Sequence, residues 1–147
     1  MYAFTSLPLV REKTGPRVFS ARNAYRFCKD MATLAQETFQ VLTLATDGAI
    51  IGRHLISLGL ANCTLAHPRE VFRPAVLDGA IEIVLVHNHV SGDPSPSDVD
   101  WDLTRNLCRA GQIMDIPVVD HIIIGRGKRR FCSLRSLRKN ACWWTAK

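Results

Sequence analysis

The stretch from His87 to Asp100 constrains this chain most, because it places two histidines and a carboxylate around one break in the backbone. It reads His-Asn-His-Val-Ser-Gly-Asp-Pro-Ser-Pro-Ser-Asp-Val-Asp. The apolar, β-branched run 80–86 in front of it predicts a buried strand. If the strand continues through the histidines, His87 and His89 project from the same face. Two neutral imidazoles that converge on one point suit an ion of the zinc class.

The residues that follow predict a third ligand. The run 91–94, Ser-Gly-Asp-Pro, is turn-forming and ends the strand. A helix is expected to begin near Ser97, with Asp100 in its first turn. Asp100 then lies at the carboxyl end of the strand, where it can complete a site with three protein ligands. Such a site leaves a fourth position for water, which is typical of catalytic zinc.

Simpler explanations exist for the same residues. A single histidine on an apolar strand is more often a hydrogen-bonded core residue. Two histidines at strand spacing, followed by an aspartate at a fixed interval, favour a metal site instead. Ser97 and Asp100 also form the Ser-x-x-Asp pattern of a capping box. Capping does not, however, require the interval back to His89. The adjacent His-Asn-His is unlike an HNH nuclease, whose motif residues are far apart in sequence.

This spacing resembles that of a known family. His-x-His, seven residues, Ser, two residues, Asp is the pattern of the JAMM (MPN-type) zinc hydrolases, and the chain carries it without a gap. More narrowly, the amino-acid sequence resembles bacterial RadC-like proteins over most of the chain. The resembling segments are 37–44, 67–73, 87–97 and 116–125. Full-length RadC-like proteins usually carry an N-terminal helix-hairpin-helix region, so the chain resembles a short form without it.

The resemblance implies an activity and a role for each site residue. It implies hydrolysis of peptide or isopeptide bonds, with Zn²⁺ held by His87, His89 and Asp100. In the family an upstream glutamate moves the proton of the metal-activated water, and the serine hydroxyl donates a hydrogen bond to the oxyanion. Glu37 and Ser97 match these two positions. The alternative for Glu37 is an exposed carboxylate before an edge strand.

Other residues compete with Glu37 or depart from the family pattern. Glu70 and Glu82 are rivals by residue type, but Glu70 lies in a predicted helix and Glu82 is expected on the strand face opposite His87. Val90, Thr38 and Thr46 stand where the family commonly has Pro, His and Asp, which affects the loop and substrate groove. Four further residues of the resemblance are expected to be structural or to orient a ligand: His67, Arg69, Asp120 and His121.

Strands and helices alternate along the chain, so the fold class is α/β with a mixed sheet. The expected helices cover about 20–36, 68–77 and 97–114, and the expected strands 38–45, 49–60, 80–89, 117–124 and 129–134. The resemblance adds a single-domain, three-layer α-β-α sandwich that is cytidine-deaminase-like. The expected organisation is an irregular lead-in at 1–19, the JAMM/MPN (RadC-like) domain at 20–134 and a basic tail at 135–147.

Composition narrows the function classes. Five scattered cysteines without Cys-x-x-Cys, and no signal peptide or apolar run of membrane length, predict reduced thiols and a cytoplasmic, non-membrane protein. The His-x-Glu and Pro-Cys-x-x-Cys signature of the zinc deaminases is absent. The formal charge is +6, with a basic cluster near the C-terminus. Its members are Arg126, Lys128, Arg129, Arg130, Arg135, Arg138 and Lys139, followed by Trp143 and Trp144.

This basic region keeps a second function open. Cations with neighbouring aromatics can bind nucleic acid, so the alternative is a DNA-repair-associated or partner-binding protein. A solvated edge and tail explains the same charges, and we favour it, because charge alone carries no site geometry. The expected partner is a peptide or protein substrate. Neither the substrate nor the oligomeric state follows from the sequence.

Overall fold

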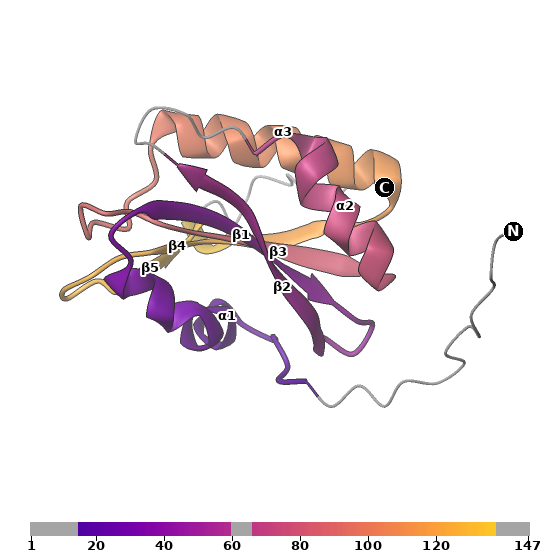
Figure 1. Ribbon diagram of the computed structural model, residues 1–147, viewed down its shortest axis with the longest axis horizontal. Coiled ribbons are helices and arrows are strands. Elements are labelled where there is room, and N and C mark those ends of the chain that lie inside the picture. The colour runs from indigo at the N-terminus through magenta and orange to yellow at the C-terminus, as the bar shows by residue number, and fades with distance from the viewer. Residues whose placement is uncertain (1–14, 60–65, 138–147) are drawn as a thin grey trace, which may run out of the picture.

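A computed structural model of the chain describes residues 15–59 and 66–137. A five-stranded sheet in the order β2-β1-β3-β4-β5 forms its centre (Figure 1). The strands are β1 (Glu37–Leu44), β2 (Ile50–Gly59), β3 (Glu82–Asn88), β4 (Val118–Ile124) and β5 (Phe131–Ser133). β3 and β4 are parallel, and the other neighbouring pairs are antiparallel. The predicted α/β class and mixed sheet are therefore confirmed.

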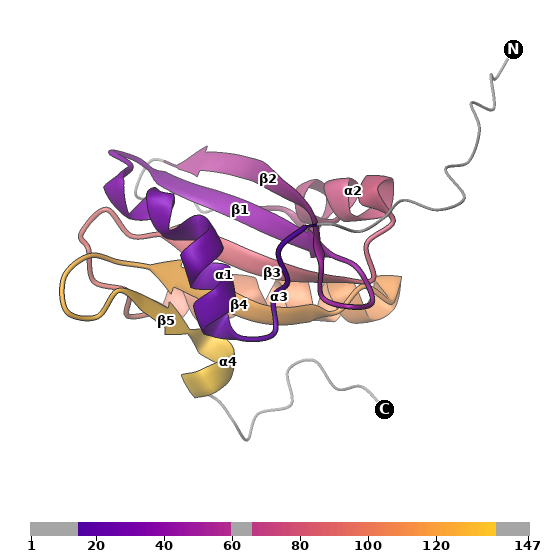
Figure 2. The same ribbon diagram turned by 90° about the horizontal axis from the view of Figure 1, so that it is seen from below.

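Helices cover both faces of the sheet and make three layers. They are α1 (Ala21–Cys28), the 3-10 helix η1 (Lys29–Thr33), α2 (Pro68–Asp78), α3 (Asp98–Met114) and α4 (Leu134–Leu137). α2 and α3 lie on one face, here called the α3 face, and α1 lies on the other, here called the α1 face (Figure 2). None of the helices in 15–59 and 66–137 is long and apolar enough to cross a membrane.

The alternation of β3 divides the core between these faces. Ile83 and Leu85 pack with α2 and α3, whereas Val84 and Val86 pack with α1 and η1. A central strand that is buried on both sides must be apolar at every position, which explains the continuous run seen in the sequence. The polar residues of β3 stand only at its ends, so the chemistry is concentrated where the strand stops.

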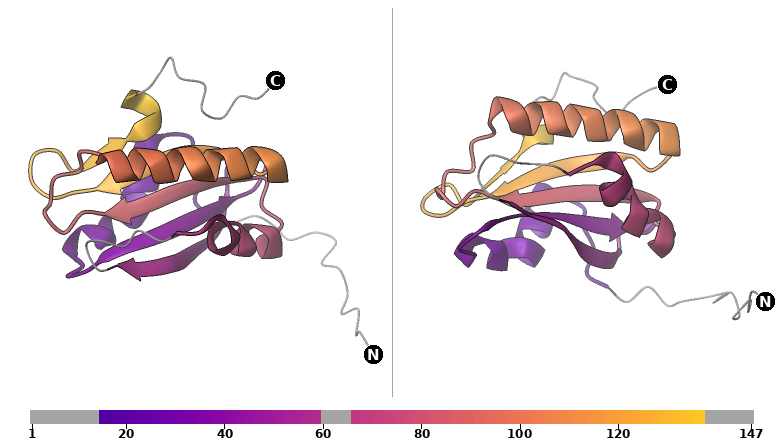
Figure 3. Two further views of the ribbon diagram at one scale, coloured as in Figure 1. Left: turned by 90° about the horizontal axis from the view of Figure 1, so that it is seen from above. Right: turned by 45° about the horizontal axis from the view of Figure 1, so that its top comes forward.

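One end of the sheet collects the chemically active segments. β3 and β4 are parallel, so their carboxyl ends meet there, and antiparallel β1 begins at the same end. The β3–α3 connection and the β4–β5 turn project side by side from this end (Figure 3). The fold therefore brings residue 37, the histidines after 86 and the turn 126–130 to the same end of the sheet.

The first helix is shorter than the sequence predicts, and the glycine inside α3 has a packing role. The predicted helix 20–36 begins after Ser20, which caps it, but the α-helix ends at Cys28 and continues as 3-10 turns. Arg53 donates to the Phe27 carbonyl and binds the Asp30 carboxylate, so a residue of β2 closes this helix. Gly111 lies within α3 and does not end it. A Cβ there would lie 2.6 Å from the Ile116 carbonyl oxygen, so the glycine permits close packing.

The chain ends fall largely outside the described residues. Arg17 bridges to Ala49, so part of the predicted lead-in pairs with the β1–β2 turn. α4, which was not predicted, occupies the start of the predicted basic tail. Arg138, Lys139, Trp143 and Trp144 of the predicted basic cluster lie outside 15–59 and 66–137, and the domain boundaries stay predictions.

Candidate metal centre

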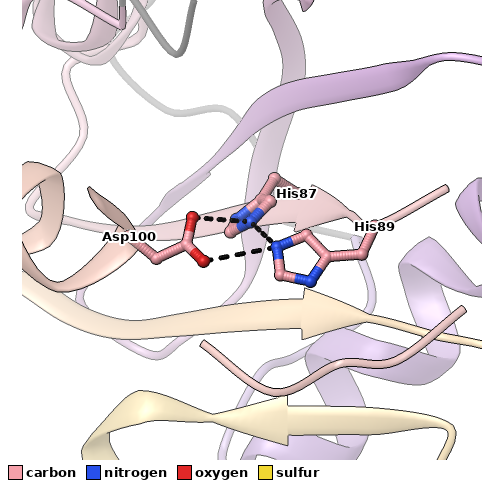
Figure 4. A group of neighbouring side chains, drawn as sticks. All are labelled: His87, His89 and Asp100. Carbon is pink, nitrogen blue, oxygen red and sulfur yellow. Dashed lines mark hydrogen bonds and ion pairs between the residues drawn. The ribbon is translucent and has the colours of Figure 1, made fainter. Parts of the chain in front are cut away.

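His87, His89 and Asp100 meet at the end of β3 (Figure 4). The Nε2 atoms of the two histidines are 2.9 Å apart. His87 Nε2 lies 3.1 Å from Asp100 Oδ1, and His89 Nε2 lies 3.3 Å from Asp100 Oδ2. His87 is the penultimate residue of β3, His89 lies just beyond the end of that strand, and Asp100 lies in the first turn of α3. The structure thus brings together the three side chains that the sequence singles out.

These separations fit a single small cation. Ligands at about 2.0–2.1 Å from a tetrahedral ion are about 3.3 Å from one another. The three distances above, from 2.9 to 3.3 Å, are close to that value. Two imidazole nitrogens with one carboxylate suit Zn²⁺, and the same donors also bind other first-row metals. The cluster could therefore hold a metal ion, whose identity the geometry leaves open.

His87 is oriented by a chain of buried side chains. Its Nδ1 lies 2.8 Å from His121 Nε2, and His121 Nδ1 lies 2.6 Å from Thr104 Oγ1. The Thr104 hydroxyl donates its one proton to the Asp100 carbonyl oxygen at 2.5 Å. His121 must therefore donate to Thr104 through Nδ1 and accept from His87 through Nε2. This assignment occupies the Nδ1–H of His87 and points its Nε2 toward the cluster.

His121 is suited to that role because it is neutral. It is fully buried, and burial lowers its pKa well below the usual value. A neutral imidazole carries one N–H and one lone pair, which is what the chain from Thr104 to His87 requires. The expectation that His121 is structural or orients a ligand agrees with this geometry.

His89 is held by the turn and not by the core. Its Nδ1 lies 2.8 Å from the Asp93 carbonyl oxygen, to which it donates, so its Nε2 also faces the cluster. Gly92, with φ of 87°, gives the turn its shape. The hydrogen bond with Asp100 raises the pKa of His89, although burial opposes it. His89 therefore holds its proton more tightly than a free histidine does, and it has to lose that proton before it can bind a metal.

Asp100 serves both the cluster and the start of α3. Its Oδ2 accepts from the Ser97 backbone N–H at 2.7 Å, and its own N–H donates to Ser97 Oγ at 3.1 Å. Burial alone would raise the pKa of Asp100, but the hydrogen bonds from His87 and His89 hold it well below its usual range. The side chain is therefore a carboxylate at neutral pH.

Ser97 takes the position that helix capping predicts. Its hydroxyl donates to Asp100 Oδ2 at 2.8 Å, and the reciprocal bonds complete a capping box. In this arrangement the serine proton points to the metal-ligand candidate. The geometry shows how Ser97 orients Asp100, and its role toward a substrate stays a prediction.

Glu37 reaches the cluster from β1. Phe39 pairs with His87 at the end of the antiparallel register, and continuing that register by two residues would set Glu37 opposite His89. The Val90 N–H donates to Glu37 Oε1 at 3.4 Å, a long bond. The Glu37 charge also contributes to the raised pKa of His89. A proline at position 90, as in the common family pattern, would have no N–H for this contact.

The rival residues lie elsewhere. Glu82 faces α1, opposite the cluster as expected, and burial raises its pKa. Glu70 is exposed in the first turn of α2 and pairs with Arg69. His67 caps α2 by accepting from the Arg69 N–H. Asp120 binds the Ser133 hydroxyl and two backbone N–H groups. Of the three glutamates weighed for the base, Glu37, Glu70 and Glu82, only Glu37 lies beside the cluster in the described part of the chain.

Two contributing residues were missed by sequence reasoning. Thr104 is four residues after Asp100, one helical turn along the same face, so its proximity to the site could have been inferred. Asn88 lies between the two histidines and points to the α1 face. Nothing in its local pattern shows what it binds, because its partners are 50 and 52 residues away.

The fold and the cluster define an α/β protein with a candidate mononuclear metal site at one sheet end. Residues 18–140 match the RadC-like JAB domain. The chain belongs to this family. It is 41% identical over 141 residues to a UPF0758 protein of Thermosynechococcus vestitus, covering 88% of this chain and 56% of that protein.

Other relatives agree with this assignment. A UPF0758 protein of Thermotoga maritima is 37% identical over 115 residues, which cover 78% of this chain and 52% of the relative. One from Desulforamulus reducens is 46% identical over 108 residues, which cover 74% and 47%. The chain thus spans about half the length of the curated relatives it matches.

Proposed function

We propose that this protein is a Zn²⁺-dependent hydrolase of peptide or isopeptide bonds. The observation that carries the proposal is the convergence of His87, His89 and Asp100 beside Glu37. Bound Zn²⁺ would supply Lewis acidity, activating water at its open position and polarising a carbonyl. Membership of the RadC-like JAB domain family supports a hydrolase of this kind.

Each protein residue has one proposed task. His87 and His89 offer Nε2 lone pairs, and Asp100 offers a carboxylate oxygen, as the three metal ligands. Glu37 is the general base, which accepts a proton at a carboxylate oxygen and returns it to the leaving amine. Ser97 donates its hydroxyl to the developing oxyanion, for which its proton must turn away from Asp100.

Metal content is the first test of the proposal. Purified, untagged protein should carry about one zinc per chain, as one site with three ligands predicts. A His87→Ala/His89→Ala double variant should carry none, as measured by elemental mass spectrometry. If the wild-type protein neither contains nor takes up zinc, the hydrolase proposal is wrong.

Turnover is the second test. Glu37→Gln removes the base but leaves all three ligands, so it should keep the metal and lose roughly 10²–10⁴-fold in rate on a peptide or isopeptide substrate. Glu70→Gln is the matched control, because Glu70 is an exposed glutamate outside the cluster. Equal rates for Glu37→Gln and Glu70→Gln would remove Glu37 as the base.

Nucleic-acid binding is a second candidate. Arg126, Lys128, Arg129 and Arg130 are all exposed in the β4–β5 turn, at the same end of the sheet as the metal cluster. Phosphate binding by such cations would weaken steeply as salt is raised. Truncation at Arg126 would remove β5 and α4, so substitution of Lys128, Arg129 and Arg130 by glutamine is the cleaner variant. No DNA binding at physiological salt would exclude this candidate.

A further inference from the structure

Asn88 is the buried residue between the two histidines, and it points away from them. The residue is 1% exposed, and its side chain points to the α1 face. Its Oδ1 accepts from the Thr38 backbone N–H at 2.8 Å, and its Nδ2 donates to the Gln36 carbonyl oxygen at 2.9 Å. The amide group therefore binds the backbone on both sides of Glu37.

The chemistry of the neighbours determines the orientation of this amide. Thr38 presents two donors to Oδ1, its N–H and its hydroxyl at 2.9 Å. Gln36 presents a carbonyl oxygen to Nδ2. The flipped amide would set an NH₂ group against the N–H and an oxygen against the carbonyl, so only one orientation satisfies all the partners.

The contact lies where the main-chain ladder stops. The β1–β3 pairing ends at Phe39 and His87, and β3 itself ends at Asn88. Beyond that point the side-chain amide of Asn88 does what a further main-chain pair would do. These hydrogen bonds connect the first residues of β1 to the end of β3, and Glu37 lies between the two residues that Asn88 binds. This pair of hydrogen bonds is called the tie below.

We propose that Asn88 is a positioning residue that holds the Glu37 carboxylate beside the metal cluster by binding the backbone of Gln36 and Thr38. The inference rests on the proposed function for its catalytic meaning, but the tie itself is independent of any activity. His87 and His89 have separate supports in His121 and Asp93, so they do not depend on Asn88.

A polar network extends the tie across the α1 face. Gln40 Nε2 donates to Thr38 Oγ1 at 3.2 Å, and Arg53 Nε donates to Gln40 Oε1 at 2.6 Å. Arg53 in turn binds Asp30 of η1 through two hydrogen bonds. The start of β1 is therefore held by Asn88 of β3 on one side and by Arg53 of β2 on the other. This favours one fixed backbone position for Glu37.

The direct test is amide hydrogen exchange, measured by NMR on the full chain. Asn88→Ala should speed exchange at the Thr38 amide by roughly tenfold, because one buried hydrogen bond is lost. The Val41 amide in the middle of β1 should exchange as in the wild type. Asn88→Asp keeps the acceptor for Thr38 but loses the donor to Gln36, so it should give a smaller increase; it also serves if the alanine variant does not fold.

The metal alone is the second probe. Zn²⁺ addition should shift the Glu37 carboxyl carbon resonance in the wild type, and Asn88→Ala should shrink that shift while zinc content stays the same. Thr43→Val is the control, since it removes another buried hydroxyl of β1, bonded to Asp78 far from the cluster. It should lower stability and leave both readouts unchanged.

The outcomes separate the two proposals. An unchanged Thr38 exchange rate in Asn88→Ala would overturn the positioning role, as would zinc loss equal to that of a ligand variant. If the role is right and Glu37 is the base, Glu37→Gln/Asn88→Ala should turn over no more slowly than Glu37→Gln alone. Wild-type turnover in Glu37→Gln, with Thr38 exchange still accelerated in Asn88→Ala, would reject the proposed base and leave the positioning of Glu37 standing.

Discussion

His87 and His89 are two residues apart, yet two different regions of the molecule hold them. His87 is 4% exposed, and its Nδ1 is bonded to His121, which Thr104 of α3 orients in turn. His89 is half-buried, and its Nδ1 is bonded to a backbone carbonyl of the turn after β3. One ligand candidate is therefore oriented by core side chains and the other by a loop.

The difference separates stability from metal binding. Changes on the core side leave buried polar groups without partners, so they should lower both the free energy of unfolding and metal affinity. Changes on the turn side can be absorbed by local opening of an exposed segment, so they should lower metal affinity with less effect on the fold. The following variants test that contrast.

The largest effect should come from Asp100→Ala, because Asp100 contacts both His87 on the core side and His89 on the turn side. It removes the carboxylate that contacts both histidines, so the protein should lose stoichiometric zinc binding, measured by elemental mass spectrometry and zinc titration. Helix stability should also fall by about 1 kcal/mol as the capping box is lost. Asp98→Ala changes an exposed aspartate two residues away and should bind zinc normally. One tightly bound zinc in Asp100→Ala would show that the cluster does not need this carboxylate.

On the core side, His121→Leu should weaken zinc binding by roughly 10–100-fold, the usual cost of losing the partner that orients a ligand. The buried His87 N–H loses its acceptor, so the free energy of unfolding should fall by about 1–3 kcal/mol. Chemical denaturation and zinc titration measure the two effects. Thr104→Ser keeps the hydroxyl and should preserve both values. A loss of zinc without a loss of stability would contradict the assignment of His121 to the core.

On the turn side, Gly92→Ala should weaken zinc binding several-fold, because a side chain at φ 87° strains the turn that holds His89. Its Cβ would also lie 3.3 Å from the Arg126 Cβ. The free energy of unfolding should fall by only about 1 kcal/mol. Gly79→Ala is the matched control, since Gly79 also has a positive φ and no atom within 4 Å of its Cβ. Equal zinc affinity in both variants would show that the turn does not orient His89.

The smallest effect should come from Asp30→Asn, on the α1 face. The hydrogen bond from Arg53 lowers the pKa of Asp30. The folded pKa lies below the unfolded one, so the pair stabilises the protein above about pH 4 and loses its contribution as the pH falls through the folded value. The Asp30 side chain is largely exposed, so the effect at pH 7 should be about 0.5 kcal/mol or less. Denaturation of both proteins at pH 7 and pH 3 measures it, and a change in zinc content would contradict the separation of the two faces.

Most of the elements could be predicted because their signals are local. The apolar run before His87, the turn residues around Gly92 and the cap at Ser97 each act within a few residues, and each element formed close to its expected bounds. The end of α1 could not be predicted, because Arg53 of β2 closes it from a distant part of the chain.

The sequence by itself determined which residues can chelate. The two-residue spacing of the histidines across the end of β3 and the place of Asp100 in the first turn of α3 are local geometry, and they set the three side chains toward one point. The tertiary structure decided which groups hold them. The β1–β3 register brings Glu37 to the cluster, the parallel pairing of β3 and β4 brings His121 to His87, and an amide on the opposite face ties down the backbone around Glu37. These contacts join residues 34 to 53 positions apart, so no local pattern contains them.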